Sequence, residues 1–344
     1  MSKPRKQSQE IRDSILKNIE EHPQDIASFT AGKFSISRQA VHRHIRQLIN
    51  DGLITVQGAT RDRKYELKPL VDFQQVLPLN ADLREDKVWR EHLRPRLEGV
   101  PPNVLSICQY GFTEMVNNAI DHSQGTLLSI SLKHTPAIIE LGITDNGIGI
   151  FNKIQKALNL DDPLHAILEL SKGKLTTDPG HHTGEGIFFT SRMFDDFRIL
   201  SGNLFFNYVE TAGDWLLEDQ KELLRGTLIT LKISPHSTRT TQQVFNRYAS
   251  GEDYGFTKTH VPVSLARYGD ENLISRSQAK RLLTRFERFN EIILDFKGVD
   301  TIGQAFADEI FRVFQNQNPK IHLTPINTHD QIEKMISRVK SATQ

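Results

Sequence analysis

The chain has 344 residues, enough for two or three ordinary domains, and its 38% hydrophobic and 25% charged content is typical of a globular rather than a disordered chain. A net charge of +1 excludes a generic polyanion binder, and a single cysteine, Cys108, excludes an intrachain disulfide and a zinc site built on cysteines. There is no apolar run of membrane-spanning length and no secretory signal pattern, so we expect a cytoplasmic protein with no membrane partner.

The first seventy residues are more basic than the rest, with 13 Lys and Arg against 8 Asp and Glu. Apolar residues at helical spacing predict a helix over 11–19, and a short second helix fits 25–31. A third helix follows Ser37, which occupies the position of an N-cap. The runs 54–56 and 64–67 bracket the loop GATRDR and predict a hairpin with a basic tip.

Three helices followed by a basic hairpin resemble the winged helix-turn-helix domains of bacterial regulators, and we assign residues 1–70 to such a domain. The resemblance implies DNA binding, with the third helix offering side chains to base edges and the hairpin reaching phosphates. The residues expected to contact DNA are Arg38, Gln39, His42, Arg43, Arg61, Arg63 and Lys64. A winged helix that contacts protein, with its charges merely solvated, is the alternative.

Residues 71–99 are charged and mixed, and we expect a helical linker there. The stretch FTEMVNNAIDHS (112–123) then combines an apolar helical face with a polar strip. A polar strip on a core helix requires a ligand or a hydrogen-bond network. Further on, an apolar strand runs into DNGIGI (145–150), a pattern that can present a carboxylate and let a ligand approach the backbone at the glycines.

A third stretch, GHHTGEGIFF (180–189), places two glycines at the start of a predicted helix. Free N–H groups and the helix dipole make such a position favourable for phosphate. His181 and His182 precede the glycines, but no further ligand at suitable spacing lies nearby, so a polar lid is favoured over a metal site.

In this order the motifs resemble the histidine-kinase-like ATPase superfamily, which has the Bergerat fold. They are Glu114-Met-Val-Asn-Asn118-Ala-Ile-Asp121, Asp145-Asn146-Gly147-Ile148-Gly149, Gly184-Glu185-Gly186 and Arg225-Gly226-Thr227. The resemblance implies an ATP-binding α/β sandwich over residues 100–236, with ATP and Mg²⁺ as cofactors.

The family pattern implies a role for each matching residue. Asn118 would hold Mg²⁺, Asp145 would accept from the adenine amino group, and Thr227 would support that contact through water. The expected ATP-binding residues are Asn118, Asp121, Asp145, Gly147, Gly149, Thr183, Gly184, Gly186 and Thr227. Lys172 or Lys174 either contacts phosphate or is solvated on a loop.

Glu114 is the expected catalytic residue. In family members that hydrolyse ATP, a glutamate four residues before the Mg²⁺ asparagine orients and deprotonates water. Kinase members can carry a residue here too, so Glu114 alone does not separate hydrolysis from phosphotransfer; we favour slow hydrolysis.

After a linker at 237–254, residues 255–344 alternate between expected strands and helices, which implies a small α/β layer with at least some parallel pairing. The strands are expected at 261–266, 291–299 and 320–326, and the helices at 275–289, 303–317 and 330–342. The run ILDFKGVDTIGQAFADEIF resembles the central segment of the STAS family and its STAS-like bacterial relatives. Gln304 and Ala305 stand where the antagonist members carry a phosphorylatable serine, so a docking or dimerising surface is favoured over phosphorylation in cis.

The sequence therefore predicts a multidomain α+β chain: a winged helix-turn-helix domain, a Bergerat-fold ATPase domain and a STAS-like domain. We expect a DNA-binding transcriptional regulator that Mg-ATP binding or slow hydrolysis controls, with a protein partner at the STAS-like domain and a homodimer by analogy with relatives. One alternative is an anti-sigma-factor-type serine/threonine kinase acting on a separate STAS partner. Another is an ATPase effector that senses nucleic acid.

Overall fold

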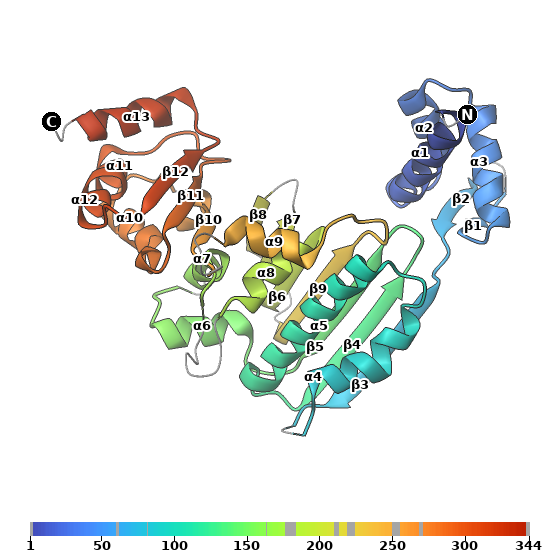
Figure 1. Ribbon diagram of the computed structural model, residues 1–344, viewed down its shortest axis with the longest axis horizontal. Coiled ribbons are helices and arrows are strands. Elements are labelled where there is room, and N and C mark those ends of the chain that lie inside the picture. Colours follow the sequence, from blue (N-terminus) through green and yellow to red (C-terminus); the bar gives the residue numbers. More distant parts are fainter. Residues whose placement is uncertain are drawn as a thin grey trace.

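The computed structural model describes residues 3–59, 62–80, 82–162, 164–175, 184–209, 213–218, 224–249, 255–267 and 271–341 (Figure 1). Across these ranges the strands form sheets of two, three and seven strands. The buried apolar residues of the same ranges fall into one cluster within the N-terminal elements and a second that spans the central and C-terminal elements. The chain is a multidomain protein of mixed α/β architecture.

The N-terminal part contains three helices and a hairpin, as the sequence predicts. The helices are α1 (Lys3–Asn18), α2 (Ile26–Phe34) and α3 (Arg38–Asn50), and the antiparallel strands are β1 (Ile54–Gln57) and β2 (Lys64–Leu67). The hydroxyl of Ser37 accepts a hydrogen bond from the Ala40 N–H, which confirms the predicted cap of α3. Val41, Ile45 and Leu48 on α3 are buried, so its charged side chains lie on the opposite face.

The expected helical linker at 71–99 is wrong for its first eight residues. They form β3 (Val71–Pro78), which pairs antiparallel with β4 (Leu127–His134) at the edge of the large sheet. As an edge strand, β3 has no fully buried residue and carries polar residues, which hides the strand pattern in the sequence. Helical turns then follow as α4 (Glu85–Val88), a π-helical turn (Trp89–Leu93) and a 3₁₀ turn (Arg94–Arg96).

The seven-stranded sheet has the order β3-β4-β5-β9-β6-β7-β8, and every pair of neighbours in it is antiparallel. The remaining strands are β5 (Ile139–Asp145), β6 (Asp196–Gly202), β7 (Leu204–Val209), β8 (Gly213–Glu218) and β9 (Leu224–Ile233). Residues alternate along β5 between buried and half-exposed, so one face of the sheet packs against helices.

The helix that crosses this packed face is α5 (Pro102–His122), which contacts β5, β9 and α8 (Gly186–Met193) (Figure 1). Two further helices, α6 (Ile150–Leu158) and α7 (Leu164–Lys172), follow the glycine turn after β5. Residues 237–254 are more than a linker because α9 (Thr241–Tyr248) packs against α8, with the rings of Phe189 and Phe245 at 4.6 Å. Its polar sequence hides a buried pair, Val244 and Tyr248, one helical turn apart.

The C-terminal part is a parallel three-stranded sheet with helices, which confirms the expected parallel pairing. The strands are β10 (Lys258–Pro262), β11 (Glu291–Asp295) and β12 (His322–Ile326), and the helices are α10 (Arg276–Leu283), α11 (Gln304–Asp308), a π-helical stretch (Glu309–Phe314), α12 (Gln315–Gln317) and α13 (Asp330–Ser341).

Several of the element boundaries predicted for this part are wrong, including that of the strand expected over 291–299, which ends at Asp295. The first strand begins at 258 and ends at 262, and residues 263–266, predicted as strand, form a 3₁₀ turn. The helix predicted over 275–289 stops at Leu283, because Arg285 has a left-handed φ of 65°. No helix in the described ranges is long and apolar enough to cross a bilayer.

Candidate functional site

A cavity of about 280 Å³ lies between α5, the ends of β5 and β9, α6 and the start of α8. Segments that are far apart in the sequence therefore meet at one place. Of the expected nucleotide-site residues, the cavity wall includes Glu114, Asn118, Asp145, Gly149, Gly184, Gly186 and Thr227. Its apolar wall includes Met115, Ile143, Ile154 and Ile229.

The helix α5 gives the cavity Glu114 and, one turn later, Asn118. The Glu114 carboxylate lies against Gly186, because a Cβ added at Gly186 would be 2.0 Å from Glu114 Oε2. Only glycine leaves room for a carboxylate so close to the first residue of α8.

Placing Asp121 in the site is not supported. Its side chain is exposed and is not part of the cavity wall, whereas His122, the next residue on α5, does line the cavity. Successive residues of a helix are turned by about 100°, so the strip that starts at Glu114 and Asn118 continues on the side of His122.

Asp145 ends β5 at the cavity and is only 7% exposed. Burial raises the pKa of its carboxyl group, while hydrogen bonds from the Gly147 N–H and from Thr227 partly offset this effect. Thr227 is its partner in the sheet register and also accepts a hydrogen bond from the Ile150 N–H at 3.0 Å. The carboxylate is thus fixed in an otherwise apolar part of the wall.

The two glycines after Asp145 have different roles. Gly149 lines the cavity at a φ of 84°, which favours glycine. Gly147 is not part of the wall; it packs against the end of α5, where an added Cβ would lie 2.0 Å from the Ser123 carbonyl oxygen. The expectation that Gly147 allows close approach of a ligand is therefore replaced by a packing role.

The GEG motif stands at the start of α8, as predicted. Gly184 has a φ of 71°, and its carbonyl accepts a hydrogen bond from the Leu175 N–H at 3.0 Å. Glu185 occupies the N-cap position of α8, and Gly186 is the first residue of that helix. Thr183, with His181 and His182, lies outside the described residues.

Lys153 is a cavity residue that the sequence reasoning missed. It lies on α6, one turn after the glycine turn, and its Nζ donates to the His122 carbonyl at 3.0 Å. The sequence did contain an indication of this role. Ile150 and Ile154 have helical apolar spacing and line the cavity, so Lys153 between them lies at the edge of the cavity.

Neither Lys172 nor Lys174 lines the cavity, which gives no support to the expected phosphate contact. The alternative of a solvated loop lysine is wrong for Lys172, which ends α7 and is buried, whereas Lys174 is half-buried in the loop that follows. Lys172 is fully buried in an ion pair with Glu169, and Lys174 Nζ donates to the Arg288 carbonyl at 2.8 Å.

The residues expected to contact DNA lie on α3 and at the hairpin of the N-terminal part. Arg38, Gln39 and Arg43 on α3 are exposed, and His42 is half-buried beside them. Arg63 and Lys64, at the end of the hairpin, are also exposed. Arg61 lies outside the described residues.

Residues 278–333 match the family described as "STAS-like domain of unknown function (DUF4325)". The match runs from α10 into the first turn of α13. No curated protein matches the chain. The chain therefore carries a STAS-like domain in its C-terminal part, as the sequence predicts.

Proposed function

We propose that the cavity binds Mg-ATP in a domain of the histidine-kinase-like ATPase type. The carrying observation is that three separated motifs converge on one cavity wall: the α5 strip, the Asp145 turn and the GEG turn of α8. Concave, mostly apolar sites with a few fixed polar groups are typical of small-ligand binding. The antiparallel sheet with helices on one face agrees with the sandwich that the resemblance implies.

The wall has one end suited to a base. The fixed carboxylate of Asp145 can accept from the exocyclic amino group of adenine, and Ile143 and Ile229 offer apolar surface beside it. At the other end, the N-terminus of α8 and its glycines suit phosphate oxygens. The helix α5 runs between these two ends of the cavity, and its polar residues line the wall there.

The residues present fit Mg²⁺ carried by nucleotide rather than a metal held by protein alone. Within the described ranges no group of three or more His, Cys, Asp or Glu side chains could hold a metal ion. Mg²⁺ commonly takes one or two protein ligands and completes its shell with phosphates and water. The Asn118 carboxamide oxygen would be that ligand, and the ion would neutralise phosphate charge.

Glu114 is the proposed general base for slow hydrolysis. It lies one turn before Asn118, and its carboxylate is held beside the start of α8, where the terminal phosphate is expected. A carboxylate there can orient water and accept its proton.

For the N-terminal part we propose DNA binding of the winged-helix type. The exposed basic face of α3 and the exposed basic end of the hairpin support it. The chain would then act as a transcriptional regulator whose DNA-binding state depends on nucleotide. A nucleic-acid-sensing effector shares the same surface, and mapping of bound chromosomal sites distinguishes the two.

A second candidate is an anti-sigma-type kinase acting on a separate STAS partner. The chain's own STAS-like domain offers Gln304 and Ala305, without hydroxyl groups, at the start of α11. Transfer of label from γ-labelled ATP to another protein would favour this candidate over hydrolysis.

The test is a calorimetric titration of Mg-ATP into the full chain and into Asp145→Asn. We expect saturable binding to the wild type and a loss of about tenfold or more in the variant, because its amide donates where the carboxylate accepts. Glu140→Gln is the matched control, since Glu140 lies on the same strand in a pair with Lys232. Equal affinity in all three proteins would refute the adenine assignment.

A further inference from the structure

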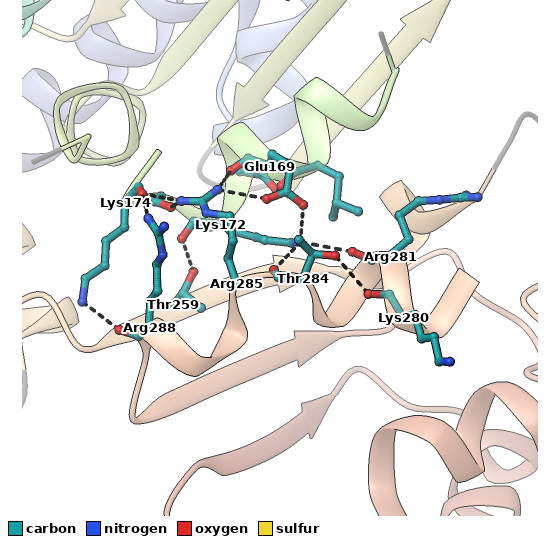
Figure 2. Close-up of polar contacts among 12 residues, drawn as sticks. Glu169, Lys172, Lys174, Thr259, Lys280, Arg281, Thr284, Arg285 and Arg288 are labelled. Atoms are coloured by element: carbon teal, nitrogen blue, oxygen red, sulfur yellow. Dashed lines mark hydrogen bonds and ion pairs between the residues drawn. The ribbon is translucent and has the colours of Figure 1, made fainter. Parts of the chain in front are cut away.

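A cluster of buried charges joins the central part of the chain to the STAS-like domain, as Figure 2 shows. Glu169 lies on α7, and its carboxylate binds Lys172 Nζ at 2.5 Å and Arg285 Nη1 at 2.9 Å. The exposed fractions of these side chains are 3%, 0% and 8%. Buried charges are unfavourable unless each is paired, so the cluster fixes α7 against the segment around Arg285.

Arg285 also binds the main chain next to this ion pair. Its Nη2 donates to the Gly173 carbonyl at 2.9 Å and to the Lys174 carbonyl. Arg288 Nη1 donates to the same Lys174 carbonyl at 3.1 Å. The planar guanidinium of Arg285 thus holds the Glu169 carboxylate and two carbonyl groups at once, which a lysine cannot do.

Bonds also run the other way across the boundary. Lys172 Nζ donates to the Thr284 carbonyl at 2.9 Å, and Lys174 Nζ donates to the Arg288 carbonyl at 2.8 Å. In the same direction as the bonds of Arg285, the Thr259 hydroxyl on β10 donates to the Lys172 carbonyl at 2.7 Å. Residues 172–174 are therefore bonded to two segments of the C-terminal part, β10 and residues 284–288.

The residue that follows this held segment belongs to the cavity. Leu175 lines the cavity, and its N–H bonds the carbonyl of Gly184, which lines it too. Lys174 and Arg285 both have left-handed φ values, 49° and 65°, which non-glycine residues rarely adopt. Such conformations persist where surrounding contacts over-determine them, and the bonds of Arg285 supply those contacts.

We propose that Arg285, from the STAS-like domain, is a positioning residue of the nucleotide site. By holding the carbonyl groups of Gly173 and Lys174, it sets the wall that Leu175 and Gly184 give to the cavity. The inference rests on the proposed ATP site. Because coupling between two sites is reciprocal, nucleotide in the cavity also stabilises the STAS-like domain against α7, and a partner docked on that domain alters nucleotide affinity.

The test uses the full chain and three variants. Arg285→Met removes the bonds of Arg285 to Glu169, Gly173 and Lys174. The triple variant Glu169→Leu, Lys172→Met, Arg285→Met removes the same bonds without leaving a buried charge unpaired. Arg276→Ala is the matched control, because Arg276 is an exposed arginine of the same part of the chain whose ion pairs, among the described residues, are with Asp308 of α11 and Glu309 of the π-helical stretch. Thermal unfolding checks the fold of each protein before any other measurement.

Two readouts are measured: Mg-ATP affinity by calorimetry, and hydrogen exchange with and without Mg-ATP. We expect both Arg285 variants to bind Mg-ATP about tenfold more weakly and the Arg276 control to bind normally. In the wild type, Mg-ATP should slow exchange in peptides that span 276–288, although none of these residues lines the cavity. That protection should disappear in the triple variant, which a purely structural role for the cluster does not predict.

The outcomes separate this inference from the proposed function. A folded triple variant that binds Mg-ATP like the wild type overturns the role of Arg285. If the wild type itself does not bind Mg-ATP, the proposed function fails. Hydrogen exchange of the Leu175 amide without nucleotide then still tests whether Arg285 positions the cavity wall. Faster exchange in the triple variant supports that role, and unchanged exchange overturns it. Should the Arg285 variants not fold, Arg288→Ala removes one bond to Lys174 from an exposed side chain and should weaken binding in the same direction.

Discussion

Asp145 and Thr227 face each other across β5 and β9, and the threonine hydroxyl hydrogen-bonds both the Asp145 carboxylate and the Ile150 amide. One side chain thus ties the carboxylate to the start of α6. This relationship gives the cavity a polar group of fixed direction before any ligand arrives, and fixed groups lose little freedom on binding.

The Asp145→Asn variant should lose nucleotide affinity without losing stability. Burial raises the pKa of Asp145, so the folded chain disfavours its charged form, and this group lowers the free energy of unfolding at pH values above its folded pKa. The asparagine variant avoids that cost and should melt at the same temperature as the wild type or higher at neutral pH. The difference should shrink as the pH falls towards the ordinary aspartate value, and a variant that melts well below the wild type would contradict this account.

The Glu114→Gln variant should bind Mg-ATP but no longer release phosphate. Glutamine keeps the size of the side chain and cannot accept a proton from water, so we expect a rate at least about a hundredfold lower. The measurement is release of γ-labelled phosphate under single-turnover conditions. Asp121→Asn, seven residues further along α5 and outside the cavity wall, should keep the wild-type rate; a loss there instead would restore Asp121 to the site.

Substituting Arg43→Ala together with Lys64→Ala should weaken DNA binding and flatten its salt dependence. Each lost phosphate contact removes about 0.9 from the slope of log affinity against log salt. Arg90→Ala is the control, since Arg90 is an exposed arginine of the central part that pairs with Asp86. Unchanged affinity and slope in the double variant would assign the N-terminal surface to protein contacts.

Acid should weaken the STAS-like domain through Asp295. Burial acts to raise the pKa of Asp295, but hydrogen bonds from His260, Asn327 and the Lys297 N–H outweigh it and lower the pKa to about 2. A depressed pKa stabilises the fold above the unfolded value of 3.8, and this contribution, about 2 kcal/mol, is lost as the pH falls from 3.8 towards 2.

Urea unfolding of the wild type and Asp295→Asn at neutral pH and near pH 3 measures this contribution. The variant should be less stable at neutral pH, and the gap should narrow in acid. Asp300→Asn, an exposed carboxylate five residues further on, serves as the control and should follow the wild type. If the difference in the free energy of unfolding between the wild type and Asp295→Asn stays constant with pH, Asp295 does not cause the loss of stability in acid.

Features determined by neighbouring residues could be predicted from the sequence. The Ser37 cap, the hairpin, the glycine start of α8 and the parallel C-terminal strands all follow from local residue types and spacing. The meeting of Glu114, Asp145 and Gly186 at one cavity was expected only through a family resemblance, because no local pattern states which distant segments touch.

Features determined by distant contacts were missed. The edge strand β3 forms through its pairing with β4, and its polar sequence alone does not indicate a strand. The helix α10 ends earlier than predicted because Arg285 turns towards Glu169, more than a hundred residues away in the sequence. Lys172 was expected at a phosphate or in solvent, since nothing near it in the sequence indicates a buried partner at Thr284. Tertiary contacts here override what the local sequence favours.

The central claim is that Mg-ATP occupies the cavity between α5, β5, β9 and α8. Photolabelling of the full chain with an azido analogue of ATP, followed by peptide mapping, tests it most directly. The account predicts label on peptides containing Ile143–Ile154 or Thr227–Ile229, which excess Mg-ATP prevents and Asp145→Asn abolishes. Label that maps to the N-terminal or STAS-like domain, or that excess Mg-ATP does not reduce, would contradict it.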